Sequence, residues 1–221
     1  MSIQQNLNHI KETLPEHVTL VAVSKTKPIS DLLEAYEAGQ RIFGENKIQE
    51  MAEKHEQLPK DIQWHMIGHV QRNKVKYMAG FVSLIHGVEN EKLLNEINKQ
   101  AEKHNRVIDC LLQIKIAAED SKFGMTAVEA SQILHSQNFP ELKHINIVGV
   151  MGMATFTENE SQIKSEFNQL KTIFKSLKIE HPKPEQFNTI SMGMSGDYPL
   201  AIACGSTMVR IGSSIFGVRN Y

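Results

Sequence analysis

Short runs of β-branched and other apolar residues alternate with helical patterns along the whole of this 221-residue chain. The runs that predict strands occupy residues 18–24, 41–44, 62–67, 81–86, 107–116, 145–151, 186–192 and 207–211. Strands separated by helices pair in parallel through right-handed crossovers, and eight of them favour a closed (β/α)8 barrel over an open doubly wound sheet. We therefore predict an α/β fold, a compact TIM barrel that forms a single domain over residues 1–221.

Helical patterns fill the segments between the predicted strands. Apolar residues spaced three and four apart predict an amphipathic helix at residues 3–14, and residues 71–79 also have a helical pattern. Thr126 with Glu129, and Thr157 with Glu160, match the capping box, in which two side chains satisfy the first backbone groups of a helix. We expect a helix to begin after each of these threonines.

The charge balance excludes several classes of partner. The chain has 24 basic and 25 acidic residues, so it lacks the basic excess of a nucleic-acid-binding or membrane-surface protein. It contains no run of 18 apolar residues and no signal-peptide pattern at residues 1–17, which predicts a cytoplasmic protein without membrane spans. Its two cysteines are expected to be buried thiols rather than a disulfide.

Two histidines are spaced as a metal pair on a helix would be. His65 and His69 lie four residues apart, but Gly68 and the strand-like start of this segment argue against a helix there. No glutamate follows His65 as the zinc-protease motif requires. We therefore expect no metal site, and we expect His65 to line a cavity instead.

Lys25 is the residue that the first predicted strand delivers at its carboxyl end, where barrels collect their functional groups. It lies on the same side as Val21 and Val23 if the strand continues. A lysine at a strand end is most often simply solvated, and that interpretation fits Lys27 better because Pro28 extends the chain there. Lys25 alone does not indicate a function.

Glycine and hydroxyl residues gather after the seventh and eighth predicted strands, at residues 191–197 and 205–214. Glycine lets backbone N–H groups approach an anion, hydroxyl groups donate hydrogen bonds, and Arg210 supplies a charged fork. Either segment alone is more simply a turn. Together they occupy the two loops where barrels often bind a phosphate, so the sequence predicts a phosphate site.

Closure of the barrel pairs the eighth strand with the first and brings Lys25 beside this phosphate site. A neutral lysine amine forms a Schiff base with a carbonyl group, and burial next to Arg210 favours the neutral amine. A phosphorylated aldehyde fits both groups. Pyridoxal 5′-phosphate is the commonest such molecule, and a phosphorylated sugar in an aldolase-type barrel is the alternative.

Seven motifs follow one another along the chain: Val21-Ala22-Val23-Ser24-Lys25-Thr26-Lys27-Pro28, Phe43-Gly44-Glu45-Asn46, Trp64-His65-Met66-Ile67-Gly68 with Gln71, Asn73 and Lys74, Ser121-Lys122-Phe123-Gly124, Met151-Gly152-Met153, Ser191-Met192-Gly193-Met194-Ser195 with Asp197, and Val209-Arg210-Ile211-Gly212 with Ile215-Phe216-Gly217. Together they closely resemble the pyridoxal phosphate homeostasis protein family. The resemblance covers nearly the whole chain. One departure is His69, where the family usually has a small residue or proline.

The resemblance implies a barrel like the N-terminal domain of alanine racemase, with pyridoxal phosphate bound as an aldimine to Lys25. It implies that the phosphate is held by Ser195, Arg210, Gly212 and Ser213. It also implies that the ring pocket is lined by Asn46, His65, Met66 and Met192. The alternative position for Arg210 is opposite the pyridine nitrogen.

The family buffers and delivers its cofactor, so the resemblance implies a carrier that supports pyridoxal phosphate and amino-acid homeostasis, with apo-enzymes as partners and no dedicated catalysis. A racemase of this kind needs a second base opposite the lysine, and we expect no chain after the eighth strand to supply one. The alternative is an amino-acid racemase or transaminase acting through the same aldimine. Lys27 and Lys122 are candidate secondary amines during transfer.

Overall fold

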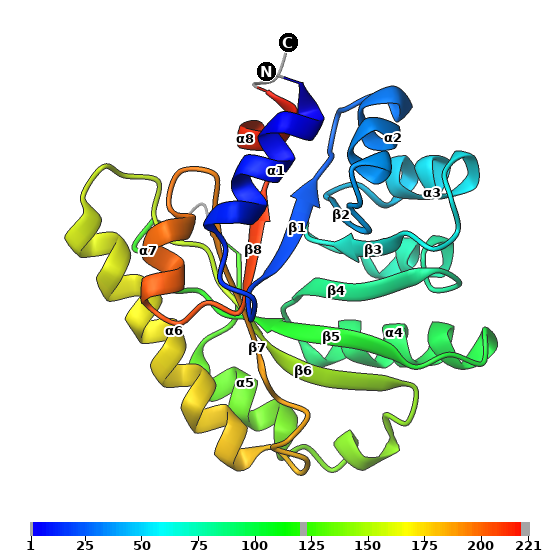
Figure 1. Ribbon diagram of the computed structural model, residues 1–221. Coiled ribbons are helices and arrows are strands. Elements are labelled where there is room, and N and C mark those ends of the chain that lie inside the picture. The colour runs from blue at the N-terminus through cyan, green and yellow to red at the C-terminus, as the bar shows by residue number, and fades with distance from the viewer. Residues whose placement is uncertain (1, 120–122, 218–221) are drawn as a thin grey trace.

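The residues described by the computed structural model, 2–119 and 123–217, form eight parallel strands that close into a barrel in chain order (Figure 1). The strands are β1 (Thr19–Val23), β2 (Ile42–Glu45), β3 (Gln63–Met66), β4 (Val82–Val88), β5 (Ile108–Gln113), β6 (Ile145–Met151), β7 (Thr189–Met194) and β8 (Met208–Ile211). β8 pairs with β1, with Val21 opposite Arg210, and this pairing closes the ring. The predicted (β/α)8 barrel is confirmed.

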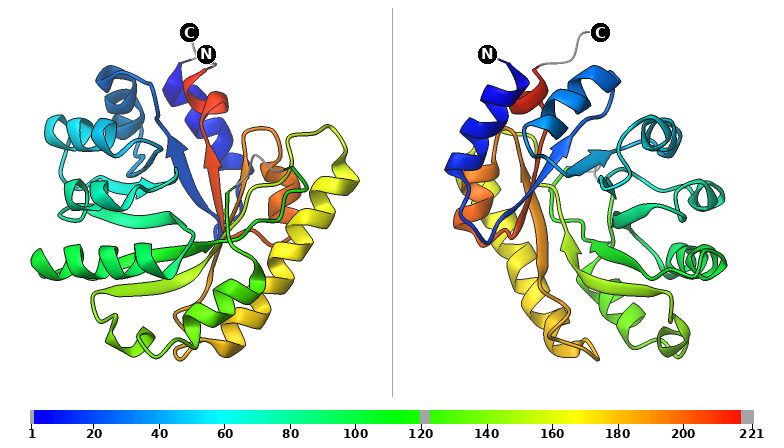
Figure 2. Two further views of the ribbon diagram at one scale, coloured as in Figure 1. Left: turned by 180° about the vertical axis from the view of Figure 1, so that it is seen from behind. Right: turned by 45° about the vertical axis from the view of Figure 1, so that its right-hand side comes forward.

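Helices lie on the outside of the ring of strands (Figure 2). The α-helices are α1 (Ile3–Thr13), α2 (Ile29–Glu37), α3 (Ile48–Gln57), α4 (Glu91–Lys103), α5 (Ala127–Leu134), α6 (Glu160–Glu180), α7 (Tyr198–Ala203) and α8 (Ser213–Phe216). Two segments are 3₁₀ helices, η1 (Arg72–Tyr77) and η2 (Phe139–Glu141). α1 and α8 lie side by side near the β1–β8 pair, and Asn6 Nδ2 donates to the Ile215 carbonyl at 3.0 Å.

Two helix predictions need correction and one is confirmed. Within the predicted helical segment 71–79, Arg72–Tyr77 form the 3₁₀ helix η1 rather than an α-helix, a form that is common in short connectors. Asn159 caps α6 in place of Thr157, because its side chain is adjacent to the helix and accepts from the Gln162 N–H. The capping box of Thr126 and Glu129 is present at α5.

Alternation along the strands divides the apolar residues between two clusters. The residues that face the barrel interior form a small cluster of Val21, Leu84, Leu111, Met151 and Met208. A much larger core lies between the strands and the helices, and Trp64, Met66 and Met192 belong to it. The barrel interior therefore keeps room for polar residues.

The described part of the chain contains no helix that is both long and apolar enough to cross a membrane. Within residues 2–119 and 123–217, no group of three or more metal-ligating side chains is placed to hold an ion. Cys110 and Cys204 are both buried free thiols, as expected.

Candidate functional site

A cavity of about 540 Å³ opens at the carboxyl ends of the strands. This is the end of a barrel at which functional groups collect, because the loops that follow the strands meet there. Six of the nine predicted site residues line it: Lys25, Asn46, Ser195, Arg210, Gly212 and Ser213. The fold thus brings Lys25 and Ser213 into one cavity, although almost 190 positions separate them in the sequence.

Lys25 reaches this cavity from the end of β1. It continues the alternation of Val21, which belongs to the inner cluster, and Val23, which lines the cavity. Its side chain is half-buried. The next residue, Thr26, has a φ of 65°, and this left-handed conformation turns the chain away from the barrel toward α2.

Ser195, Gly212 and Ser213 form a small polar nest opposite the end of β1. The Gly212 N–H donates to Ser195 Oγ at 3.2 Å, which joins the loop after β7 to the turn after β8. Asp197 Oδ1 accepts from the Met194 N–H at 2.6 Å and tightens the first of these loops. Hydroxyl and backbone N–H groups gathered in this way suit an anion.

Gly212 lets the nest lie close to Val23 at the end of β1. A Cβ atom at position 212 would lie 3.1 Å from the Val23 carbonyl oxygen and 3.2 Å from Val23 Cβ. Since contacts this short involve the backbone of β1, a side chain at position 212 would push the turn away. The absence of a side chain lets the nest lie directly against the strand that carries Lys25.

Arg210 lies in the barrel interior at the floor of the cavity and is 4% exposed. Its guanidinium donates to Ser191 Oγ at 2.6 Å and to the Gly152 carbonyl at 3.1 Å. Burial lowers the pKa of Arg210 to about 10, and the charge of Asp197 opposes this shift. Arg210 therefore remains a cation at neutral pH.

His65 lies below the cavity rather than on its wall. His65 Nδ1 contacts His86 Nε2 at 3.1 Å, and His86 Nδ1 contacts Ser191 Oγ at 3.0 Å, so both rings belong to one buried chain that ends at Arg210. Burial lowers the pKa of His65 to about 3, and burial with the neighbouring charges lowers the pKa of His86 far below its ordinary value. Both imidazoles are neutral near pH 7.

Met66 and Met192 are not part of the cavity wall, which corrects the prediction for these two residues. Both are buried between the strands and the outer helices. The reason is the alternation of strand side chains, since Met66 follows the inward-facing His65 and Met192 follows the inward-facing Ser191.

Several residues at the mouth of the cavity were not among the nine predicted site residues. Gln113 ends β5 and donates to the Phe123 carbonyl at 2.9 Å, and the ring of His69 stacks on that of Phe123. Met153 and Phe156 complete this side. Asking what β5 delivers at its carboxyl end would have identified Gln113.

Of the two candidate secondary amines, Lys27 and Lys122, the structure describes only Lys27. Lys27 lines the cavity, and its ammonium donates to the Phe216 carbonyl at the end of α8, at 2.7 Å. Lys122 lies outside the described residues. A role for either amine in transfer stays a prediction.

Comparison with known proteins assigns the chain to a family. Residues 1–220 match the family model of the alanine racemase N-terminal domain. The chain is 38% identical to the pyridoxal phosphate homeostasis protein of Haemophilus influenzae, covering 100% of this chain and 98% of that protein. The protein of the same name from Vibrio alginolyticus is 39% identical, with 100% and 99% covered. This chain belongs to the pyridoxal phosphate homeostasis protein family.

Solved structures agree with this assignment. PipY of Synechococcus elongatus, determined with pyridoxal phosphate bound, is 32% identical with a TM-score of 0.89, and the match covers 98% of this chain and 100% of PipY. Alanine racemase from Bartonella henselae is 17% identical with a TM-score of 0.73, and the match covers 98% of this chain and 58% of the racemase. The second likeness shows the fold alone. The predicted resemblance to the pyridoxal phosphate homeostasis protein family is confirmed.

Proposed function

We propose that this protein holds pyridoxal 5′-phosphate covalently on Lys25 and releases it by exchange. The observation that carries the proposal is the placement of Lys25 and the nest of Ser195, Gly212 and Ser213 in one cavity. An amine and an anion-binding nest on neighbouring strands match the aldehyde and the phosphate of one small molecule. The relatives named as pyridoxal phosphate homeostasis proteins and the PipY structure with pyridoxal phosphate support it.

The bound group supplies an aldehyde carbon that an amine attacks reversibly. The Lys25 nitrogen forms a bond to this carbon, two protons leave the nitrogen, and the aldehyde oxygen departs as water. A second amine reverses the attachment by displacing Lys25 from the same carbon. Neither reaction needs an oxidant or a reductant: water would reverse the attachment to Lys25, and a second amine would take over the aldehyde carbon and leave Lys25 as its amine.

The remaining cavity residues fit the rest of the molecule. Asn46 Oδ1 is buried without a hydrogen-bond partner among the described residues, and an orphaned acceptor in a cavity wall suits a ligand that donates a hydrogen bond, such as a ring hydroxyl. The guanidinium of Arg210 donates to Ser191 Oγ of β7 and to the Gly152 carbonyl just after β6. Neither acceptor belongs to the turn after β8. We therefore place Arg210 opposite the pyridine nitrogen rather than on the phosphate.

A carrier function agrees better than an enzymatic one with the names of the curated relatives and with the exposed edge of the cavity. The curated relatives are named as homeostasis proteins, and the racemases are more distant in sequence. Phe156, which lines the cavity, is 94% exposed, so this side of the cavity faces solvent. We propose cytoplasmic apo-enzymes that need pyridoxal phosphate as the recipients.

The proposal is tested by reducing the wild-type protein with borohydride in the presence of pyridoxal phosphate and mapping the modified peptide by mass spectrometry. We expect a pyridoxyl group on Lys25. Lys25→Ala should lose the visible imine absorbance and keep weak phosphate-anchored binding, whereas a control, Lys143→Ala at an exposed position, should behave as wild type. A wild-type protein modified only on other lysines would contradict the site, and absence of any pyridoxyl adduct would favour the aldolase alternative.

The enzyme alternative is tested on a panel of D- and L-amino acids. We expect no turnover by the loaded protein at the rates of ordinary enzymes. Racemization or transamination at about 1 s⁻¹ or faster would replace the carrier function with catalysis. Transfer of pyridoxal phosphate to an apo-enzyme in the presence of a scavenger of the free molecule tests direct delivery.

A further inference from the structure

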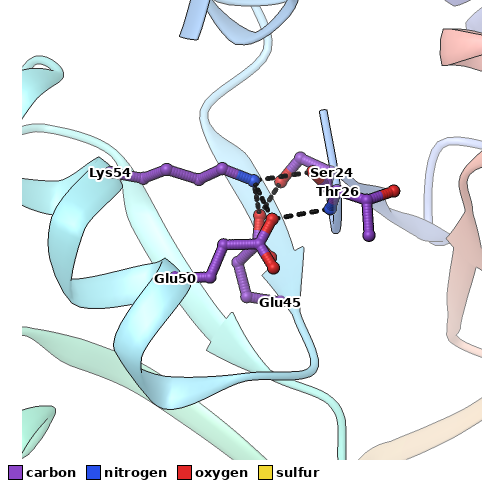
Figure 3. Close-up of polar contacts among 5 residues, drawn as sticks. All are labelled: Ser24, Thr26, Glu45, Glu50 and Lys54. Atoms are coloured by element: carbon purple, nitrogen blue, oxygen red, sulfur yellow. Dashed lines mark hydrogen bonds and ion pairs between the residues drawn. The ribbon is translucent and has the colours of Figure 1, made fainter. Parts of the chain in front are cut away.

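A cluster of charged side chains lies between α3 and the carboxyl ends of β1 and β2 (Figure 3). Its centre is Lys54 of α3, which is 5% exposed. The Lys54 ammonium donates to Glu45 Oε1 and Glu50 Oε1, both at 2.7 Å, and to the Ser24 carbonyl at 2.8 Å. Ser24 Oγ also donates to Glu45 Oε1, at 2.6 Å.

This cluster holds the backbone on both sides of Lys25. The Ser24 carbonyl, just before Lys25, accepts from Lys54. The Thr26 N–H, just after Lys25, donates to Glu50 Oε1 at 2.6 Å. Since Lys54 and Glu50 are themselves an ion pair on one helix, the two peptide groups that bracket Lys25 are held by a single rigid unit.

Stability alone is a poor explanation for such a cluster. Removing an ion pair from water costs so much free energy that apolar packing of the same volume is often equally stable. Burial raises the pKa of Glu45, although Lys54 and Ser24 oppose the shift, and Glu45 Oε2 is buried with no partner in the described part of the chain. Directional contacts of this kind specify a backbone geometry, and here the specified geometry includes the left-handed Thr26.

We propose that Lys54 and Glu50 are positioning residues, which fix the backbone on both sides of Lys25 and so direct its amine at the aldehyde carbon. This inference rests on the proposed function, because it concerns the reaction of that amine. A lysine side chain has several rotatable bonds, and holding its backbone restricts the region that the amine searches. Misplacement by about 1 Å can slow a reaction up to a hundredfold.

The first test compares Glu50→Ala with Glu50→Gln. The alanine variant removes the acceptor of the Thr26 N–H, whereas the glutamine variant keeps an oxygen in that place. Stopped-flow measurement of imine absorbance at saturating pyridoxal phosphate should show a rate about tenfold lower for Glu50→Ala and within about twofold of wild type for Glu50→Gln. Glu56→Ala, at an exposed position of the same helix, is the matched control and should keep the wild-type rate.

Two further readouts separate positioning from a structural defect. Pyridoxine 5′-phosphate lacks the aldehyde, so its affinity should be unchanged in Glu50→Ala if only the amine is misdirected. Hydrogen exchange of the Thr26 amide, measured without ligand, should be faster in Glu50→Ala than in Glu50→Gln. Lys54→Met should repeat the slow imine formation and the unchanged pyridoxine phosphate affinity, which provides a second variant if Glu50→Ala does not fold.

The outcomes distinguish this inference from the proposed function. If wild-type protein forms no imine on Lys25, the proposed function fails and the inference fails with it. If wild type forms the imine and both Glu50→Ala and Lys54→Met form it at the wild-type rate, the inference alone is overturned. An equal loss of imine rate and pyridoxine phosphate affinity in both variants also overturns it, because the cluster then merely supports the fold.

Discussion

Arg210 keeps its positive charge inside the barrel because its environment is polar as well as buried. Burial lowers its pKa to about 10, yet the Asp197 charge and the Ser191 and Gly152 contacts favour the charged form. The neighbouring imidazoles of His65 and His86 are neutral. The floor of the cavity thus carries the positive charge of Arg210, and the two neighbouring imidazoles do not change their charge around pH 7.

Arg210→Gln should weaken the retention of pyridoxal phosphate and leave the imine with Lys25 possible. Hydrogen bonds to charged groups contribute about 1.5–3 kcal/mol, so we expect a dissociation constant about ten- to a hundredfold higher, measured by equilibrium dialysis. Arg41→Gln, which removes a partly exposed guanidinium paired with Asp61, is the control and should bind as wild type. Unchanged affinity in Arg210→Gln would refute the ring-side placement.

At the residue scale, the sequence predicted the cavity wall well and the interior poorly. Lys25 and Gly212 were identifiable because they follow strands, where side chains collect whatever the exact register. His65 and Met66 were both assigned to the pocket, although neighbours on one strand face opposite sides. The chain from His65 through His86 to Arg210 depends on barrel register, which no local pattern in the sequence reports.

The turn from β8 into α8 contains Gly212 and Ser213 of the nest and lies against β1, which ends just before Lys25. It packs against Val23, and the Lys27 ammonium binds the Phe216 carbonyl at its far end. Both contacts come from β1 or from the loop after it. The loop after β1 and the last helix of the described chain, α8, therefore form one structural unit.

Gly212→Ala should separate this unit. The added Cβ atom would meet the Val23 backbone at 3.1 Å, and relief of such overpacking costs about 1–3 kcal/mol. We expect lower stability in urea unfolding and faster loss of pyridoxal phosphate on gel filtration. Gly80→Ala, whose Cβ would meet only the His104 ring at 3.4 Å, is the control. Wild-type retention in Gly212→Ala would show that the close approach has no role in binding.

At the element scale, the strands were predictable because their apolar runs are short and bounded by polar segments. Every predicted strand corresponds to an observed one, with ends shifted by a few residues. Helix starts were less predictable, since Thr157 and Asn159 both have side chains that can cap a helix, and Asn159 is the one that accepts from the Gln162 N–H. The 3₁₀ form of η1 had no distinct pattern.

The closed barrel encloses His65 and His86 as neutral groups, and this links the stability of the whole molecule to pH. Their pKa values are lowered from the ordinary 6.5, so between pH 6.5 and about 3 the unfolded chain binds more protons than the folded one. The stability from their burial is complete above pH 6.5 and is lost as the pH falls.

Urea unfolding between pH 5 and 7.5 checks this linkage. We expect the free energy of unfolding to fall with decreasing pH by at most about 1.4 kcal/mol per unit for each imidazole. His65→Gln should reduce the slope, whereas His17→Gln, at an exposed position, should not change it. Equal slopes in His65→Gln and wild type would contradict the account.

Pairing of β8 with β1 also sets when the protein can first hold its ligand. The lysine is made early in synthesis, but Arg210 and the Gly212 turn emerge from the ribosome almost at the end of the described chain. On the proposed function, a nascent chain that lacks β8 has the Lys25 amine without Arg210 and the Gly212 turn. Such a chain could form the imine but would lack these groups for retaining the ligand, so firm retention would begin only once the barrel has closed.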